Sequence, residues 1–159
     1  AQLKEKAQSL NLAYKMLENA YNKMQDRFAP QINKKAGEIL SVFTKNKYSK
    51  LYMNIKNEIK LDDNSNIRQL SLYSAGTNDI IYFAVRLAVV FLIFSDNLPP
   101  IIIDDSFSRV DKHRLKQIFQ YLSEISIKSQ IILFTCREEE FNLANNLANL
   151  LKIWIRVVF

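Results

Sequence analysis

The sequence predicts an α/β fold, with a parallel or mixed sheet flanked by helices and preceded by a coiled-coil helix. A heptad-spaced apolar stripe opens the chain, short continuous apolar runs recur in its second half, and helical patterns separate those runs. Strands that alternate with helices typically form a parallel sheet, because each crossover needs a helix. Of the 159 residues 48% are hydrophobic, which is enough to form a core rather than a disordered chain.

The first element is predicted to be a helix with a narrow apolar stripe. The stripe consists of Leu3, Ala7, Leu10, Tyr14, Leu17, Tyr21, Met24 and Phe28. Its alternating steps of four and three are the a/d spacing of a coiled coil. The bulky Tyr and Met residues favour an antiparallel partner helix from the parent protein over a parallel zipper, and an amphipathic helix lying on the domain is the alternative. Pro30 should end this helix, because proline lacks an N–H and clashes with the preceding turn. We therefore predict a coiled-coil helix over residues 1–29 and a lobe over residues 30–159.

The next segment is predicted to contain a second helix and a small group of strands. Apolar residues have helical spacing over 32–43, whereas they alternate with polar residues over 51–55 and 58–61, as in a hairpin. DDNSN, residues 62–66, has turn chemistry. A short strand over 67–72 then leads to the sequence YSAGTND.

The second half should alternate helices and strands. In order, we expect a helix over 77–95, a strand in PPIIIDD, a helix in DKHRLKQIFQYLSEI, a strand in SQIILFTC, a helix over 138–150 and a strand in LKIWIRVVF. The continuous apolar runs predict strands buried on both faces of the sheet. The longest apolar run, 80–94, is interrupted by Arg86 and is shorter than the roughly 18 to 20 residues that span a bilayer. No membrane partner is expected.

Composition narrows the classes of function. A single cysteine, Cys136, excludes an internal disulfide and a cysteine-based zinc cluster, and it favours a reducing, cytoplasmic location. The net charge of +6 is uneven, since residues 1–60 hold 12 basic against 5 acidic residues and residues 61–159 hold 10 against 11. A basic half can bind nucleic acid or can simply be a solvated helix surface, and charge alone leaves both interpretations open.

Polar residues gather where the predicted parallel strands end, and ligand sites of open α/β sheets lie at that edge. Asp104 and Asp105 end the first buried strand, Ser108 and Asp111 follow in the loop, and residues 135–137 end the second strand. Neighbouring strand residues point to opposite faces, so one carboxylate can approach a metal and the other a water. Taken alone, the pair is explained more simply as a turn in which Asp caps the next helix.

The stretch YSAGTND, before the long apolar helix, has two interpretations. The N–H groups at a helix N-terminus, with the Ser74 hydroxyl and the small Gly76, can bind an anion. The same residues form an ordinary N-cap, with Asp79 favourable in the first turn. Taken alone, the stretch favours the cap.

Together and in this order, the motifs resemble the C-terminal lobe of an ABC-type ATPase head of the SMC and recombination-repair class, and most closely the YhaN-like coiled-coil AAA ATPases. YSAGT corresponds to the signature motif and YFAVRLAVVF to the signature helix. IIIDD corresponds to Walker B, SRVD to the D-loop and ILFTCR to the switch strand. The resemblance covers nearly the whole chain. It implies the C-terminal half of a P-loop ABC-type ATPase head that dimerises around ATP and acts in DNA repair or maintenance.

The resemblance implies catalytic roles for three residues. Asp104 would hold Mg²⁺ through its water shell, and Asp105 would polarise the attacking water. Arg137 stands where the family usually has a switch histidine; it cannot relay a proton but can steady phosphate charge. His113, the only histidine, is interpreted as a surface residue. Many ABC ATPases have Glu at the position of Asp105, although paired aspartates occur in the YhaN-like group.

The resemblance also implies residues of a site shared between two heads. The residues that would contact the γ-phosphate of ATP bound to the other protomer are Ser74, Ala75, Gly76 and Thr77. Asp111, with Ser108, would carry the D-loop contact between the two sites. Tyr73 replaces the usual Leu and is expected to pack.

The sequence contains no phosphate-binding loop of the form G-x-x-x-x-G-K-[ST], since its only glycines are Gly37 and Gly76. The resemblance implies that this loop lies in an N-terminal Walker A lobe of the parent protein, and that ATP and Mg²⁺ bind only with that lobe present. The expected partners are therefore this lobe, a second head in a homodimer, and DNA. Two alternatives remain. A non-catalytic, nucleotide-gated interaction module is suggested by Ala75 and Arg137, and a transporter nucleotide-binding domain is disfavoured by the heptad stripe.

Overall fold

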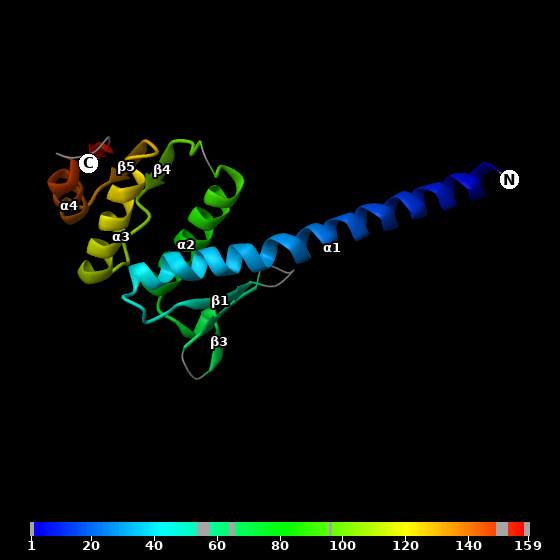
Figure 1. The fold of residues 1–159 in the computed structure, drawn as a ribbon, viewed down its shortest axis with the longest axis horizontal. Helices are drawn as coiled ribbons and strands as arrows, with labels where there is room; N and C mark the ends of the chain where they lie inside the picture. Colours follow the sequence, from blue (N-terminus) through cyan, green and yellow to red (C-terminus); the bar gives the residue numbers. More distant parts are fainter. Residues whose placement is uncertain (1, 54–57, 64–65, 96, 149–152, 158–159) are drawn as a thin grey trace.

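A long N-terminal helix, α1 (Gln2–Phe43), projects from a body of helices and strands (Figure 1). The structure is a computed structural model, and it describes residues 2–53, 58–63, 66–95, 97–148 and 153–157. The further elements are β1 (Lys50–Met53), β2 (Ile59–Asp62), β3 (Ile67–Gln69), the 3-10 helix η1 (Leu70–Leu72), α2 (Ala75–Ile93), β4 (Ile101–Asp104), α3 (Lys112–Ile125), β5 (Ile131–Thr135), α4 (Glu138–Ala148) and β6 (Ile153–Val157).

The predicted helix break at Pro30 is wrong, because Pro30 lies inside α1. Proline deprives the carbonyl of Asp26 of its helical hydrogen bond. Asp26 is exposed, so water can bond this carbonyl in place of the missing N–H. Beyond Pro30 the helix packs against α2, β1 and α3, and these contacts hold the chain helical through the lost bond.

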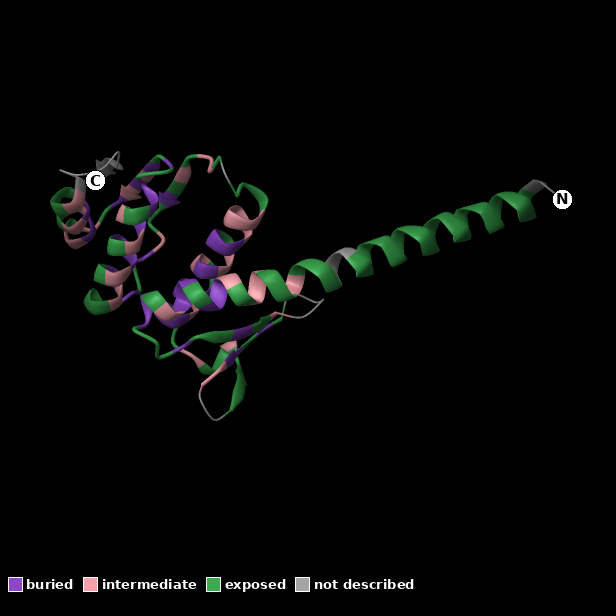
Figure 2. Cartoon of the chain, viewed as in Figure 1, coloured by how far each residue is buried: buried purple, intermediate pink, exposed green. Residues whose placement is uncertain are grey.

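The N-terminal part of α1 is exposed to solvent and projects away from the body (Figure 2). Leu3 is 86% exposed and Leu17 is 72% exposed, and the other described stripe residues through Phe28 are also exposed. Partial burial begins at Ala29, and Ala36 is fully buried. The alternative of a helix lying on the domain is therefore excluded. The division into 1–29 and 30–159 stays a prediction, although exposure changes at that point.

The strands of the described residues form two separate three-stranded sheets. The predicted hairpin is confirmed: β1 and β2 are antiparallel, with Leu51 opposite Leu61, and β3 adds antiparallel to β2. The strand predicted over 67–72 ends at Gln69 and continues as η1. β4, β5 and β6 form a parallel sheet, in agreement with the predicted parallel or mixed sheet, and β5 is its central strand. The predicted final strand partly lies outside the described residues.

The core lies between the C-terminal part of α1, α2 and α3. Phe43 of α1 contacts the rings of Phe83 and Tyr121 at centroid distances of 5.9 and 5.4 Å, and Phe107 lies 5.0 Å from Phe83. α2 begins earlier than the apolar run suggests, and its 19 residues are long and apolar enough to cross a membrane by length and composition. Seven of its residues are buried in the protein, whereas Ile93 at its end is 64% exposed.

β4 is not buried on both faces, contrary to the prediction. Ile103 is 2% exposed, but its neighbour Ile102 is 66% exposed. β5 pairs with one side of β4, and no other described strand pairs with the second side. A hollow of about 220 Å³ lies beside it, lined mainly by apolar residues of α2 and β4 such as Leu87 and Val90. The apolar run of this strand therefore exceeds what the described part of the chain covers.

Candidate functional site

Ser74 is the N-cap of α2. Its backbone is extended (φ −63°, ψ 153°), and its Oγ accepts a hydrogen bond from the Thr77 N–H at 3.3 Å. Arg114 of α3 donates to the Thr77 Oγ1 at 2.9 Å. Gly76 and Thr77 are buried, whereas Ser74 and Ala75 are exposed. The capping role of Ser74 is confirmed, but Asp79 lies beyond the first turn of α2, which contains no acidic residue. Within the signature motif, Ser74 and Ala75 are the exposed residues.

Tyr73, just before this cap, packs as expected. Its ring lies 5.7 Å from that of Tyr48 in an edge-to-face arrangement. Burial raises the pKa of the Tyr73 hydroxyl. The replacement of the usual Leu by Tyr is therefore accommodated by packing against the segment that follows α1.

Gly76 permits a close approach, but the approaching group belongs to the same chain. A Cβ at this position would overlap the carbonyl oxygen of Arg109 and lie 2.9 Å from its carbonyl carbon. It would also lie 3.5 Å from the Cα of Val110. The first turn of α2 thus packs directly on the loop that follows β4, residues 105–111, which we call the β4–α3 loop.

An ion pair joins the same two segments. Arg109 donates from Nε to Asp79 Oδ2 at 2.9 Å and from Nη2 to Oδ1 at 2.6 Å. The hydrogen bond and charge of Asp79 raise the pKa of Arg109. The Arg109 side chain is 61% exposed, so solvent screens this pair and it contributes orientation more than stability. α2 and the β4–α3 loop of one chain therefore meet at two points, Gly76 and Asp79.

Asp104 and Asp105 are both exposed at the carboxyl end of β4. Asp105 has a φ of 40°, in the left-handed region, while its N–H donates to the Phe134 carbonyl at 2.9 Å. Such a conformation costs about 1 kcal/mol or more in a non-glycine residue, and local strain of this kind often occurs at functional sites. Cys136 donates from Sγ to Asp105 Oδ1 at 3.5 Å, and this bond raises the pKa of the Cys136 thiol.

The chemistry of Asp104 fits the Mg²⁺ that the resemblance implies. Among the described residues no group of three or more His, Cys, Asp or Glu side chains could hold a metal. Mg²⁺ does not require such a cage, because it keeps several waters and is commonly bound by one or two carboxylates together with substrate phosphates. Asp104 could supply one such carboxylate at the accessible edge of the sheet.

A polar hollow of about 260 Å³ brings part of the predicted site together. It is lined by Asp79, Tyr82, Phe83, Arg86, Asp105, Ser106, Ser108 and Arg109. The sequence placed Arg86 on the signature helix but gave no reason to expect it beside Asp105, and it did not single out Ser106. The signature residues 74–77 and Arg137 do not line this hollow. Within one chain, the predicted ATP-site residues therefore do not form a single site.

Arg137 contacts the β4–α3 loop of its own chain. Its Nη1 donates to the carbonyl oxygens of Phe107 at 2.9 Å and Ser108 at 3.3 Å. The same atom lies 3.3 Å from Glu140 Oε1, and Nη2 lies 3.5 Å from Glu139 Oε2. A role of Arg137 toward phosphate stays a prediction, because the structure shows its guanidinium bonded within the chain.

Glu140 was missed by sequence reasoning. It is 0% exposed, and its Oε2 accepts a hydrogen bond from the Thr135 Oγ1 at 2.8 Å. Burial raises the pKa of Glu140. The sequence pattern that could have identified Glu140 is its position three residues after Arg137 at a helix start, where an i, i+3 ion pair can form.

Asp111 is the N-cap of α3. Its Oδ1 accepts from the backbone N–H groups of His113 at 3.1 Å and Arg114 at 3.0 Å. The capping role that the sequence suggested for the adjacent aspartates thus belongs to Asp111. His113 is exposed, as predicted. A D-loop contact of Asp111 or Ser108 with another protomer stays a prediction.

Replacing Asp111 with Ala should lower the free energy of unfolding by about 1 kcal/mol, because two helix N–H groups lose their acceptor. Urea denaturation followed by circular dichroism measures the change. Asp111→Asn keeps an acceptor oxygen and should restore most of the loss. Equal stability of the Ala variant and the unmodified chain would show that the cap contributes nothing.

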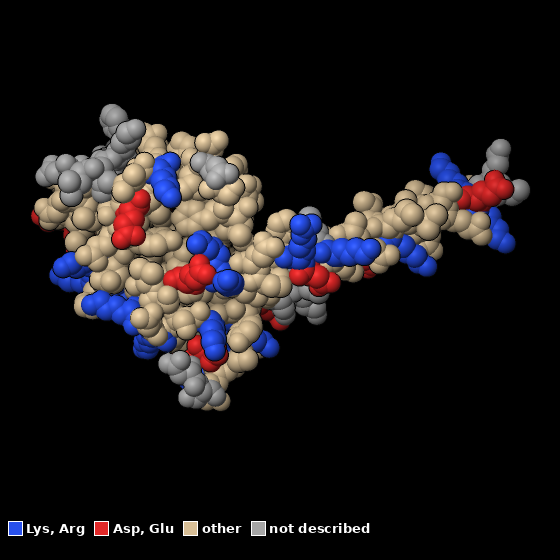
Figure 3. Space-filling model, in the orientation of Figure 1, with Lys and Arg blue, Asp and Glu red and all other residues tan. Residues whose placement is uncertain are grey.

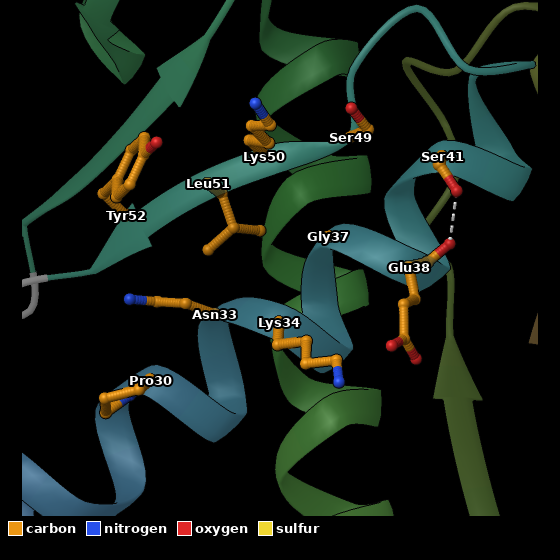
Figure 4. Close-up of a pocket in the computed structure, with 10 residues that line it drawn as sticks. All are labelled: Pro30, Asn33, Lys34, Gly37, Glu38, Ser41, Ser49, Lys50, Leu51 and Tyr52. Carbon is orange, nitrogen blue, oxygen red and sulfur yellow. Dashed lines mark hydrogen bonds between the residues drawn. The ribbon is translucent and has the colours of Figure 1, made fainter.

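A different hollow, of about 620 Å³, lies between α1 and β1, away from these residues (Figure 4). Beside it, a Cβ on Gly37 would overlap the Ser49 carbonyl oxygen, and Asn33 Oδ1 accepts the Met53 N–H at 3.0 Å. None of the candidate site residues lines this hollow. Its contacts join the projecting helix to the first sheet.

Comparison with known proteins gives one related sequence and several similar folds. No family model matches the chain. It is 25% identical over 133 residues to the "Uncharacterized protein YhaN" of Bacillus subtilis (strain 168). This match covers 82% of the chain but only 14% of that protein, so the chain spans a small part of its relative.

Similar solved structures are SMC ATPase heads. One, from work on ATP-driven dimerization and DNA-stimulated activation of SMC ATPases, matches with a TM-score of 0.64 and 19% identity over 79% of this chain and 78% of that chain. An Smc head with a coiled coil and joint from Pyrococcus yayanosii has a TM-score of 0.61 and 18% identity, over 91% of this chain and 29% of that one. An Smc head with an extended coiled coil from Pyrococcus furiosus, bound to the C-terminal domain of ScpA, has a TM-score of 0.60 and 18% identity, over 85% and 35%. At these identities the likeness concerns the fold.

Proposed function

We propose that this chain, an SMC-like head fragment with the fold of the C-terminal part of such a head, completes an ATP-binding and ATP-hydrolysing unit with an N-terminal lobe. The observation that carries the proposal is the unfinished sheet at the candidate site. β4 bears Asp104 at its carboxyl end, yet no described strand pairs with its second edge, and Ile102 is 66% exposed. A strand of another lobe would pair with this edge and cover the apolar hollow beside it. In open α/β sheets, phosphate-binding loops follow the carboxyl ends of the strands. The carboxyl end of the added strand would therefore lie next to the carboxylates of Asp104 and Asp105.

The proposed chemistry is mostly positioning and charge neutralisation, as is usual in phosphoryl transfer. Asp104 would hold Mg²⁺ through its water shell, and the bound ion would neutralise phosphate charge. Asp105 would orient the attacking water and accept its proton. The hydrogen bond from Cys136 and the bond from the Asp105 N–H to Phe134 fix this residue at the end of β4.

The proposed working unit is a homodimer. Ser74 and Ala75 are exposed, and neither lines the hollow that contains Asp105. A site that needs both groups is therefore best completed by a second copy, with the signature of one head facing the ATP of the other. This arrangement agrees with the ATP-driven dimerization described for SMC ATPases of the same fold.

The exposed stripe of α1 supports an antiparallel coiled-coil partner from the same parent protein. Leu3 is 86% exposed. An apolar side chain of this kind contributes to stability only when a partner removes it from water. Lysine and arginine side chains are spaced along this helix and on the adjoining face of the body (Figure 3). We propose DNA as the polyanion that they meet, and a cytoplasmic role in DNA repair or maintenance.

The ATPase rate of the full-length protein, measured with and without DNA, tests this proposal. We expect ATP turnover that DNA raises, and DNA binding that weakens steeply with salt because phosphate contacts release counterions. Absence of turnover would overturn the enzymatic role. Turnover without any salt-sensitive DNA binding would overturn the DNA role alone.

The bonds of Arg137 within the chain favour a second candidate function, that of a nucleotide-gated interaction module without ATP turnover. Its guanidinium is occupied by Phe107, Ser108 and two acidic side chains rather than directed to an open site. This candidate predicts ATP-dependent dimers and no hydrolysis. Light scattering with and without ATP, alongside the ATPase assay, separates the two functions.

A further inference from the structure

The β4–α3 loop is held from two sides by contacts of unequal strength. On the α2 side, Arg109 pairs with Asp79, but the arginine is 61% exposed. On the α4 side, Arg137 is 29% exposed and Glu140 is fully buried. A screened surface pair contributes little, whereas removing one partner of a buried pair leaves an uncompensated charge. Of these two ion-paired contacts, the one on the α4 side is therefore the stronger, and it acts beside the buried ring of Phe107, which packs against Phe83.

On the α4 side, a chain of hydrogen bonds connects the end of β5 to the β4–α3 loop. Thr135, at the end of β5, donates to Glu140 Oε2 at 2.8 Å, while Glu140 Oε1 lies 3.3 Å from Arg137 Nη1. The Arg137 N–H also donates to Thr135 Oγ1 at 3.0 Å. Arg137 then reaches the carbonyls of Phe107 and Ser108. Glu140 thus fixes both the backbone and the guanidinium of Arg137.

We propose that Glu140 is a positioning residue that, through Arg137, sets the place of the β4–α3 loop and so of Asp105 and Ser108 in the ATPase site. Glu140 does not line the hollow at Asp105 and is not exposed to solvent. Its hydrogen-bond partners are Thr135 and Arg137, and of these two Arg137 is the one that contacts the loop. In place of a switch side chain directed at phosphate, this chain has a cation that joins the switch strand to its own D-loop. The inference rests on the proposed function, because its kinetic consequence needs a working ATPase.

The test compares Glu140→Gln with Glu138→Gln in the full-length protein. Both lose one negative charge from the first turn of α4, but Glu138 is exposed and lies outside the network. We expect kcat of Glu140→Gln to fall about tenfold with KM for ATP unchanged, since small misplacement of reacting groups lowers rate more than binding. Glu138→Gln should behave as the unmodified protein.

Hydrogen exchange supplies a readout that does not need turnover. The Val110 N–H is bonded to the Phe107 carbonyl at 2.9 Å inside the loop. Its exchange should accelerate about tenfold in Glu140→Gln, as expected for local opening, while amides of β5 keep their protection. If Glu140→Gln does not fold, Arg137→Lys replaces it, because lysine keeps the charge but has one nitrogen in place of the two that contact the loop carbonyls, Glu140 and Glu139.

The outcomes are distinct. Faster loop exchange with lower kcat supports the inference. Exchange and kinetics equal to those of Glu138→Gln overturn it, and so does a uniform loss of protection across the fold, which would mark a structural role only. If the unmodified protein has no turnover, the proposed function fails, and loop exchange alone still decides whether Glu140 holds the loop.

Discussion

Asp105→Asn in the full-length protein is expected to lower kcat for ATP hydrolysis by at least about a hundredfold, the usual contribution of a positioned general base. The amide keeps the size of the side chain but cannot accept the proton of the attacking water. Nucleotide binding should change little, because Asp104 and the signature residues are untouched. A steady-state ATPase assay and an equilibrium nucleotide-binding assay measure the two effects.

Asp26→Asn is the matched control, since Asp26 is an exposed aspartate on the bare part of α1. It should leave kcat unchanged. Comparable rates for Asp105→Asn and Asp26→Asn would remove Asp105 from the mechanism.

Gly76→Ala should destabilise the chain by about 2 to 3 kcal/mol, within the range for overpacking a rigid site. The added Cβ would overlap the Arg109 carbonyl oxygen, and the neighbour that must move is backbone rather than a flexible side chain. Helix propensity alone predicts the opposite sign, a gain of about 1 kcal/mol for replacing Gly by Ala. The sign of the change in urea denaturation therefore tells which effect wins.

Ala75→Ser provides the control for this substitution. Ala75 is exposed in the same helical turn, so one added atom there meets solvent and should change stability by less than about 0.5 kcal/mol. A stabilised Gly76→Ala variant would mean that α2 and the β4–α3 loop do not pack as the structure shows.

The order of elements and the motifs at the strand ends were predictable because both depend on local patterns. Heptad spacing identified α1, and short apolar runs identified β4 and β5. What local patterns could not give was the effect of partners distant in sequence. Pro30 was expected to end a helix, but packing of the following turns against α2 and β1 overrides that local preference.

The candidate site shows the same limit. Gly76 was expected to admit a phosphate, whereas its nearest neighbour is the Arg109 backbone. The hydrogen bonds of Arg137 to two loop carbonyls and to the buried carboxylate of Glu140 were not predictable from spacing, and its role toward phosphate stays a prediction. Ile102 was expected to be buried, and it is exposed because the described part of the chain leaves its face of β4 uncovered, whereas Ile103 on the opposite face is buried. Each difference arises from a tertiary contact, or the lack of one, that spacing along the sequence does not encode.

The central claim is that Asp105 of one head and the signature of another serve the same ATP. Mixing two inactive full-length variants, Asp105→Asn and Ala75→Asp, tests it most directly. Ala75 is exposed at the start of α2, where an added carboxylate suits the helix N-terminus but repels phosphate. In a symmetric dimer, half of the mixed population carries both variants, and each such dimer has one intact shared site.

We therefore expect the mixture to recover about a quarter of the unmodified ATPase rate, although each variant alone is inactive. If Asp105 and Ala75 instead served an ATP bound within a single head, every site in the mixture would carry one lesion. A mixture no more active than its separate components would contradict the shared-site account.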